Sequence, residues 1–306
     1  MKNKPVLSVI IVSFNTKEII KRCLDSLYQF TSGLDYEVVV VDNSSRDSSA
    51  EMLSIFEPGH KNFKLIRSTT NIGFGPANNL GAKEAVGEYL LFLNSDTLFI
   101  ENNLPHCINE IEKDKNIGVY SCNLTNKDGS HQPSGGYFPN LGRLFAWQFF
   151  IDDIPPFSNL IDSIHPHTSR KQPDWVTGAF MIIPTKIFWE AGGFDEKIFM
   201  YTEEMELCYR IKKLGRIVIH DSQTSIIHLG GASGGNYLAI TAEVAGLLYF
   251  WRKHLPRWQL PLVKLFFFVG SLLRYVIFGI IKANATARQA YSQILRLLVR
   301  QIGGLA

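Results

Sequence analysis

The side chains best suited to chemistry in this sequence are carboxylates and amides that follow short apolar segments. In Phe92–Thr97 an apolar β-strand closes on Asp96. Burying Asp96 within such a strand would cost several kcal/mol, so we expect it at the open carboxyl end, where parallel sheets bind ligands. A carboxylate flanked by Asn94 and Ser95 suits a divalent cation that carries phosphate oxygens. Because the same residues are ordinary turn formers, a plain turn is the alternative.

Three further segments place polar side chains after predicted strands. Ser13 and Asn15 follow the first strand, Asp42 ends the second, and Asn71 follows the third. The carboxyl ends of neighbouring parallel strands meet at one edge, so together these side chains are predicted to line a crevice for a nucleotide. Asp42 is suited to accept the imide N–H of uracil or thymine, with Ser13 and Asn15 near ribose and phosphate. Each residue taken singly is better explained as a helix cap or a turn, and only the four segments together favour the nucleotide site.

The glycine-containing segment 71–81 differs from a dinucleotide-binding fingerprint. Asn78 stands where the third glycine would be, Pro76 interrupts the turn, and the segment follows the third strand instead of the first. We interpret it as a loop that brings Asn79, at a helix start, toward the crevice. A pure turn-and-cap role is the alternative.

A second acidic cluster, formed by Glu203, Glu204 and Glu206, opens a predicted helix after Thr202. Thr202 is a good N-cap and the helix dipole favours anions in the first turn, which is a purely structural explanation. However, three neighbouring carboxylates repel one another, and aromatic residues precede them like a pocket wall. A carboxylate held there is suited to act as general base on a sugar hydroxyl.

A histidine, His228, ends a later apolar segment and is followed by the glycine-rich stretch 230–235. Imidazole is a ligand for Mn²⁺, so His228 is predicted to complete the coordination of the ion held by Asp96, or to contact a diphosphate. A packed or surface histidine is the structural alternative.

The elements that must position these residues alternate between strand and helix. Apolar runs predict buried strands at 6–12, 37–41, 63–67 and 89–93, and helical stripes lie at 17–29, 48–56 and 77–86. This alternation predicts an α/β fold with a doubly wound, mostly parallel sheet. Residues 123–174, rich in Gly, Pro, Ser, His and Asn, predict a long loop region with one helix along a substrate cleft. Order is expected to return at 175–183, at a helix near residue 202 and at a strand over 217–219.

Charge divides the 306 residues into an acidic body and a basic tail. Residues 236–306 carry nine Lys or Arg and one acidic residue, a net +8, so the first 235 residues carry −5 of the overall +3. The four cysteines are scattered without ligand spacing, which argues against a zinc site or a disulfide framework and indicates reduced thiols. The first residues lack the apolar stretch of a signal peptide, so a cytoplasmic protein is expected.

The tail combines its charge with apolar stretches. Residues 260–281 are strongly apolar but include Lys264 and Arg274, and Arg274 would lie near the middle of a spanning helix. A basic amphipathic helix lying in the membrane interface fits better, and 289–301 adds a second such stretch. We predict peripheral attachment to the anionic inner face of the cell membrane. A helical lid or dimer surface is the alternative, and no nucleic-acid partner is expected, because the basic residues lie among aliphatic ones.

In this order, the motifs resemble family 2 glycosyltransferases, in particular their rhamnosyltransferase-like bacterial branch. The segments that carry the resemblance are 9–15, 39–45, 71–81, 91–96, 175–179, 192–195, 199–210 and 228–231. The resemblance implies a nucleotide-sugar-binding GT-A fold, a divalent cation, and inversion at the anomeric carbon. We expect a glycosyltransferase domain over 1–235, with an acceptor-side loop region at about 123–174, and a C-terminal helical, membrane-associating region over 236–306.

The resemblance also implies roles for single residues. Asp96 and His228 would hold Mn²⁺ or Mg²⁺ on the donor diphosphate, and Glu204 would be the catalytic base. The residues assigned to nucleotide-sugar binding are Ser13, Asn15, Asp42, Asn71, Asn79, Asn94, Ser95 and Asp96, and those assigned to the acceptor or donor-sugar side are Trp175, Gly178 and Glu203. Asn94 stands where many relatives carry Asp, and Glu203-Glu204 replaces Glu-Asp, which leaves the choice between the two glutamates open.

The implied reaction moves a sugar, with rhamnose as one candidate, from a dTDP- or UDP-linked donor to a saccharide or lipid-linked saccharide in cell-surface polysaccharide synthesis. Two alternatives stay open. A sugar nucleotidyltransferase would need a lysine- and glycine-rich phosphate loop near the first strand, where this chain has residues 13–16, Ser-Phe-Asn-Thr. The second alternative is a non-catalytic sugar or lipid-carrier binding module. The presence of Asp96, Glu204 and His228 argues against it.

Overall fold

The computed structural model describes residues 4–151, 154, 170–230 and 236–302. The chain forms two compact units. The sheet unit comprises Met1–Tyr137, Ser163–Phe199 and Glu203–Ser233, and the helical unit comprises Phe138–Asp162, Met200–Thr202 and Gly234–Ala306.

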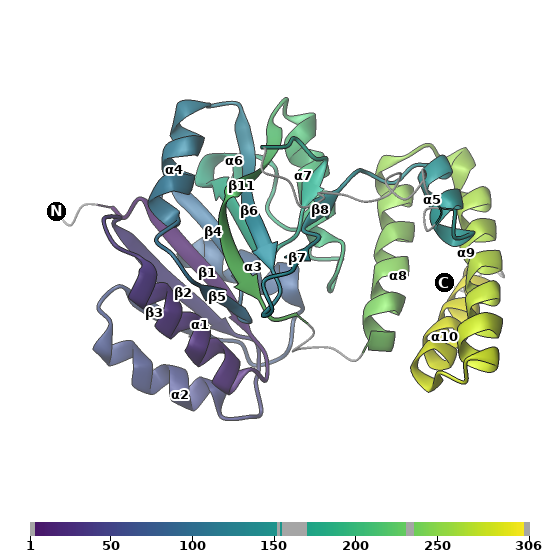
Figure 1. Cartoon of the computed structure of the whole chain (residues 1–306), viewed down its shortest axis with the longest axis horizontal. Helices are drawn as coiled ribbons and strands as arrows, with labels where there is room; N and C mark the ends of the chain where they lie inside the picture. Colours follow the sequence, from purple (N-terminus) through teal and green to yellow (C-terminus); the bar gives the residue numbers. More distant parts are fainter. Residues whose placement is uncertain (1–3, 152–153, 155–169, 231–235, 303–306) are drawn as a thin grey trace. The chain divides into compact units, whose positions relative to one another are not determined.

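Over the described residues, nine strands of the sheet unit form one sheet (Figure 1). They are β1 (Leu7–Ser13), β2 (Tyr36–Asp42), β3 (Phe63–Arg67), β4 (Tyr89–Asn94), β5 (Thr97–Phe99), β6 (Ile117–Thr125), β7 (His131–Gln132), β10 (Phe180–Pro184) and β11 (Ile217–His228). Their order is β3-β2-β1-β4-β10-β6-β11-β5, with β7 beside β6. The first four strands in this order are parallel to one another, as are β6 and β11, while β10 and β5 run antiparallel to their neighbours. The predicted α/β fold with parallel strands is confirmed.

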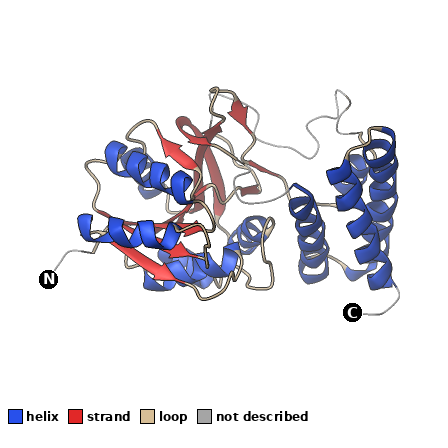
Figure 2. Ribbon diagram, turned by 90° about the horizontal axis from the view of Figure 1, so that it is seen from below, coloured by secondary structure: helices blue, strands red, loops and turns tan. Residues whose placement is uncertain are grey.

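Helices cover both faces of this sheet (Figure 2). They are α1 (Lys17–Phe30), α2 (Ser49–Phe56), α3 (Phe74–Glu84), α4 (Leu104–Lys113), α6 (Thr185–Glu190) and α7 (Glu203–Lys213). Side chains alternate along a strand, so Val9 and Ile11 pack with Leu24 of α1, whereas Val12 packs with Ala77 of α3 on the opposite face. Burial on both faces leaves the strand ends as the place for polar side chains.

The predicted helix over 77–86 begins three residues earlier, at Phe74. Gly73 precedes it with φ +93°, a backbone conformation that favours glycine, and Pro76 is accommodated in the first turn, where its missing N–H leaves no carbonyl unpaired. The glycine loop is therefore a sharp entry into α3.

The region 123–174 contains β7, the strand β8 (Gly135–Gly136) and one helix, α5 (Leu141–Gln148). Its residues 152–153 and 155–169 lie outside the described part of the chain. The regular secondary structure predicted over residues 175–183 consists of two strands. β9 (Trp175–Val176) pairs with β8, and β10 joins the main sheet. The chain changes partner between these strands, which is why a single apolar run becomes two strands.

The helical unit holds α5, α8 (Asn236–His254), η3 (Arg257–Gln259), α9 (Leu260–Arg274), η4 (Tyr275–Ile281) and α10 (Ala285–Ile302). The helix α10 packs against α8 and α9, and α5 packs against α9. The predicted C-terminal helical region is confirmed. Residues 257–281 form one helical stretch long and apolar enough to cross a membrane by length and composition, with mean hydropathy 1.8.

Arg274 is buried in the helical unit instead of facing outward. Its Nη1 donates to the Gln148 carbonyl at 2.7 Å, and its guanidinium lies 4.2 Å from the centre of the Phe150 ring. The carbonyls at the C-terminal end of α5 carry partial negative charge, so they stabilise this cation. The charge in the middle of the apolar stretch is therefore satisfied within the protein.

Candidate active site

The strand register brings the predicted crevice residues to one edge of the sheet. Ser13 is paired with Asp42 across β1 and β2, and Val12 is paired with Asn94 across β1 and β4. Non-glycine residues with positive φ follow the first two of these strands, at Asn15 (+54°) and Ser44 (+68°). Such backbone costs about 1–3 kcal/mol per residue and is concentrated at functional sites.

Asp42 is almost fully buried at this edge. Its Oδ2 accepts the Ser45 N–H at 3.1 Å, while Oδ1 is buried without a hydrogen-bond partner among the described residues. A buried acceptor left unpaired costs about 1–3 kcal/mol, so native structures rarely contain one without a reason. The free oxygen is available to a donor N–H from a bound molecule.

The other predicted nucleotide-side amides are held by the protein itself. Asn15 Oδ1 accepts the Arg46 N–H at 2.7 Å, and Asn71 Oδ1 accepts from Asn43 Nδ2 at 3.0 Å. Asn79 uses both ends of its amide on the Phe194 backbone, accepting and donating at 2.8 Å. In this structure these side chains shape the loops around the edge. Asn43, which sequence reasoning did not select, links the 71–73 loop to the end of β2.

Asp96, Asn94 and His228 converge from two strands that are far apart in the sequence. The end of β11 pairs antiparallel with β5, so His228 lies opposite Thr97. Its Nε2 is 3.2 Å from Asp96 Oδ1 and 3.2 Å from Asn94 Nδ2. The predicted pairing of this carboxylate with this imidazole is thus present, with Ser95 mostly buried between the other two polar residues of the turn.

This donor set fits a divalent cation that arrives with its substrate. No group of three His, Cys, Asp or Glu side chains gathers into a metal cage in the described part of the chain. Asp96 and His228 would supply two ligands, and the 3.2 Å between His228 Nε2 and Asp96 Oδ1 matches the roughly 3 Å between adjacent ligands of an octahedral ion with bonds of about 2.1 Å. Diphosphate oxygens and water would complete such a shell.

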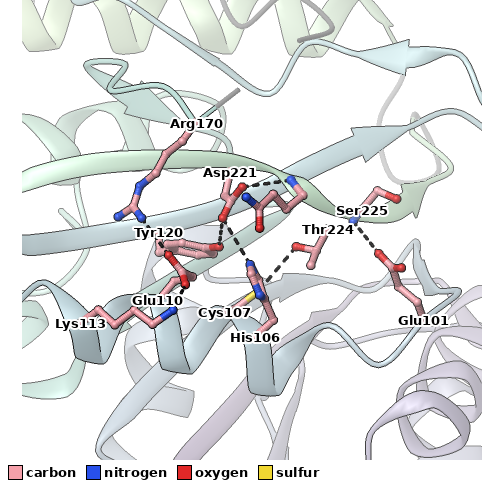
Figure 3. Close-up of polar contacts among 11 residues, drawn as sticks. Glu101, His106, Cys107, Glu110, Lys113, Tyr120, Arg170, Asp221, Thr224 and Ser225 are labelled. Atoms are coloured by element: carbon pink, nitrogen blue, oxygen red, sulfur yellow. Dashed lines mark hydrogen bonds and ion pairs between the residues drawn. The ribbon is translucent and has the colours of Figure 1, made fainter. Parts of the chain in front are cut away.

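A β-bulge in β11 sets the register that delivers His228. The pairing of β11 with β6 shifts between Asp221 and Ser225. Asp221 is held there by the Tyr120 hydroxyl, at 2.7 Å, and the His106 ring, at 3.4 Å (Figure 3). It also accepts the Gln223 N–H at 3.0 Å. Burial alone would raise the pKa of Asp221, but these hydrogen bonds outweigh it and hold the pKa below the usual 3.8.

Glu204 lies in the first turn of α7, with one oxygen in use. The backbone N–H of Gly178 bonds to its carboxylate, while Oε2 is buried without a partner among the residues that the structure describes. Burial raises the pKa of Glu204 above its usual 4.5. Ala179, which follows Gly178, accepts the Asn94 N–H at its carbonyl, at 3.1 Å. The backbone of residues 178–179 therefore links the Glu204 carboxylate to the turn that holds Asp96.

The other two glutamates of the cluster have different surroundings. Glu206 is fully buried and accepts twice from Arg210 Nε, each at 2.9 Å, while Arg210 also donates to the Gly193 carbonyl at 2.6 Å. This ion pair fastens α7 to the 191–193 loop. Glu203 is buried beside Gly75 at the start of α3. Of the three carboxylates, Glu204 is the one with a buried unpartnered oxygen.

The segment 131–137, which sequence reasoning treated only as part of a loop, contacts both sides of the site. Gln132 Oε1 lies 2.8 Å from His228 Nδ1, and the Tyr137 carbonyl accepts from Trp175 Nε1 at 3.2 Å. Gly136 pairs with Trp175. No spacing or composition signal marks Gln132, because its partner is ninety-six residues away.

Comparison with known proteins identifies the family of the chain. Residues 8–175 match the family described as Glycosyl transferase family 2. The chain is 30% identical over 216 residues to the low-salt glycan biosynthesis hexosyltransferase Agl10 of Haloferax volcanii, covering 68% of this chain and 62% of that protein. It is 24% identical over 274 residues to an N-acetylglucosaminyl-diphospho-decaprenol L-rhamnosyltransferase of Mycobacterium tuberculosis, covering 84% of this chain and 88% of that one.

Solved structures share the fold at low identity. GalNAc-T7 with UDP, GalNAc and Mn²⁺ superposes with a TM-score of 0.62 at 18% identity, over 92% of this chain and 58% of that one. The mannosyltransferase PcManGT of Pyrobaculum calidifontis, with GDP-Man and Mn²⁺, gives 0.58 at 15% identity, over 98% and 88%. The expected GT-A-like fold is confirmed. Since the family match spans more than half of its 306 residues, the chain belongs to glycosyl transferase family 2.

Proposed function

We propose that this protein is a glycosyltransferase that moves a sugar from a dTDP- or UDP-linked donor to a saccharide or lipid-linked saccharide in cell-surface polysaccharide synthesis. The observation that carries the proposal is a set of incompletely paired acidic groups near one sheet edge: Asp42 Oδ1, Glu204 Oε2 and Asp96 facing His228. Purely structural carboxylates would have found partners on folding. The names of the mycobacterial and archaeal relatives support rhamnose or another hexose as the sugar.

Asp42 is proposed to recognise the base of the donor. Its unpartnered Oδ1 accepts hydrogen bonds only, and the imide N–H of uracil or thymine is a donor of matching kind. Ser13 and Asn15, which lie at the same edge, would stand near the ribose and phosphate. Asn71, Asn79, Asn94 and Ser95 would shape the loops that enclose the donor.

Asp96 and His228 would hold Mn²⁺ or Mg²⁺. The bound cation would neutralise charge that develops on the departing nucleoside diphosphate. The Mn²⁺ in both solved structures supports this reading.

Glu204 is proposed as the base that removes the acceptor proton. A general base works best when its pKa approaches the working pH, and burial shifts the pKa of Glu204 in that direction. The hydroxyl would attack from the face of the sugar opposite the leaving diphosphate, so the product would be inverted. Trp175, Gly178 and Glu203 would lie beside the acceptor or the donor sugar.

The test is thermal unfolding of the purified protein with UDP, dTDP and GDP and their sugar conjugates, each with Mn²⁺, with Mg²⁺ and with chelator. A cation-dependent rise in Tm for uracil or thymine compounds alone is expected, followed by release of the nucleoside diphosphate when acceptor extracts are added. Pyrophosphate release from a nucleoside triphosphate would favour the nucleotidyltransferase. No response to any nucleotide would favour the binding module.

The C-terminal region 236–306 is proposed to attach the enzyme to the inner face of the cell membrane, with residues 1–235 carrying the transfer reaction. Exposed apolar side chains recur at helical spacing along α9 and η4, at Leu262, Leu265, Leu272, Val276 and Ile280. With the +8 charge of the region, such a stripe suits a helix lying in an anionic interface. Co-sedimentation with vesicles containing phosphatidylglycerol, but not with neutral vesicles, is expected. Absence from both would contradict attachment.

A further inference from the structure

Both ring nitrogens of His228 have polar neighbours, and each neighbour constrains the ring differently. Nδ1 is 2.8 Å from Gln132 Oε1, which can only accept a hydrogen bond. Nε2 is 3.2 Å from Asn94 Nδ2, which can only donate. The one arrangement of a neutral imidazole that satisfies both contacts places the hydrogen on Nδ1 and the lone pair on Nε2.

This arrangement points the Nε2 lone pair toward a second electron-pair donor, Asp96 Oδ1, at 3.2 Å. Two such electron-pair donors repel each other unless a proton or a metal cation lies between them. The hydrogen bond from Nδ1 also fixes the plane of the ring, as the outer partners of metal-bound histidines do. The amide of Gln132 therefore prepares the other side of the ring for a metal ion.

The backbone around Gln132 fits this role. Gln132 lies in β7, which pairs antiparallel with β6, so its position is set by the main sheet. Gly230, with φ +66°, follows His228, and a Cβ built there would lie 3.4 Å from Gln132 Nε2. Because Gly230 has no side chain, it leaves room for Gln132 Nε2 while Gln132 Oε1 contacts the His228 ring.

We propose that Gln132 is a positioning residue that holds His228 as an Nε2 metal ligand and thereby sets the affinity of the site for the divalent cation of the donor complex. The inference rests on the proposed function, because it assumes that Asp96 and His228 hold that cation.

The experiment compares Mn²⁺ affinity, measured by electron paramagnetic resonance titration with saturating UDP or dTDP. Gln132→Met keeps the length of the side chain and removes the acceptor, and we expect its Kd for Mn²⁺ to rise roughly 10- to 100-fold. Gln132→Glu restores an acceptor and is expected to bind Mn²⁺ at least as tightly as the natural protein. The matched control is Gln223→Met. Gln223 is an exposed glutamine at the bulge of β11, the strand that carries His228, and its replacement should leave the Kd for Mn²⁺ unchanged.

Nitrogen-15 NMR of the histidine rings gives a readout that needs no metal. The proposal expects His228 to be protonated at Nδ1 in the natural protein and to lose this preference in Gln132→Met. An Nε2–H ring in the natural protein would overturn it, as would an unchanged Mn²⁺ affinity in Gln132→Met, and both results leave the proposed function intact. Failure of the natural protein to bind Mn²⁺ with any nucleotide would overturn both.

Discussion

Two carboxylates of the sheet unit, Asp221 and Glu204, differ in their hydrogen-bond partners and in the direction of their pKa shifts. Both have buried oxygens, and both are near strands that deliver the candidate site. Asp221 receives hydrogen bonds from Tyr120 and His106 (Figure 3) and from the Gln223 backbone, and these bonds lower its pKa. The Glu204 carboxylate receives hydrogen bonds from its own backbone N–H and that of Gly178 and keeps Oε2 unpaired among the described residues, and burial raises its pKa.

The difference separates structural acids from candidate catalytic ones. A buried carboxylate whose partners are supplied by the fold stabilises the folded state as an anion. One whose partner is missing lowers stability as an anion and retains the capacity to take a proton. The direction of the pKa shift, together with the hydrogen-bond inventory, thus distinguishes the bulge of β11 from the start of α7 more sharply than residue type does.

The largest expected effect comes from Glu204→Gln, which should lower kcat by about 10²–10⁴-fold, because the variant cannot accept the acceptor proton. Donor affinity should remain, as measured by calorimetry with UDP- or dTDP-sugar. Glu203→Gln is the matched comparison, and a smaller loss there assigns the base to Glu204. Equal losses of donor binding and turnover in Glu204→Gln would instead make Glu204 a structural carboxylate.

The same variant should also be more stable than the natural protein at neutral pH. Because the folded-state pKa of Glu204 is raised, its contribution to stability is fully present below the unfolded value of 4.5 and is lost as pH rises through the folded pKa. The Tm advantage of Glu204→Gln should therefore grow with pH and vanish in acid. An advantage that is independent of pH would contradict this assignment.

A smaller effect is expected from Asp42→Asn, which removes the charged acceptor proposed for the base. A hydrogen bond to a charged group contributes about 1.5–3 kcal/mol, so the Kd for UDP or dTDP should rise roughly tenfold to a hundredfold. UDP methylated at N3 of uracil should bind the natural protein as weakly as unmodified UDP binds Asp42→Asn. The methylated ligand and the variant together should lose little more affinity than either change alone. Full additivity would show that Asp42 and N3 do not interact.

The smallest effect on activity, with a clear effect on stability, is expected from Asp221→Ala. Loss of its partners leaves the Tyr120 hydroxyl buried and unpaired, so the free energy of unfolding in urea should fall by about 1–3 kcal/mol. The exposed Asp128→Ala should change it by less than about 0.5 kcal/mol. Because the pKa of Asp221 is lowered, its stabilisation should persist down to about pH 4 and decline only as pH falls through the folded value, below the usual 3.8. Unchanged stability would mean that the bulge does not depend on this carboxylate.

Much of the fold follows from local pattern. The apolar runs that become β1, β2 and β4 are recognised directly in the sequence. A strand that is buried on both faces is a continuous run of apolar residues, without alternating polar ones. The polar residues at their ends were predictable for the same reason: an acid cannot be buried within such a run, so Asp42 and Asp96 had to stand where the strands end.

The sequence by itself determined which strands are buried, which acids end them, and that a basic, apolar tail follows. Only the tertiary structure decided which of the three glutamates in the first turn of α7 keeps an unpaired oxygen, since that depends on Arg210 reaching Glu206 and not Glu204. It also decided that the amide of Gln132 meets His228, because the register of β11 after its bulge sets that contact. Local patterns encode burial, whereas the pairing of polar groups depends on distances between segments that only the packed chain defines.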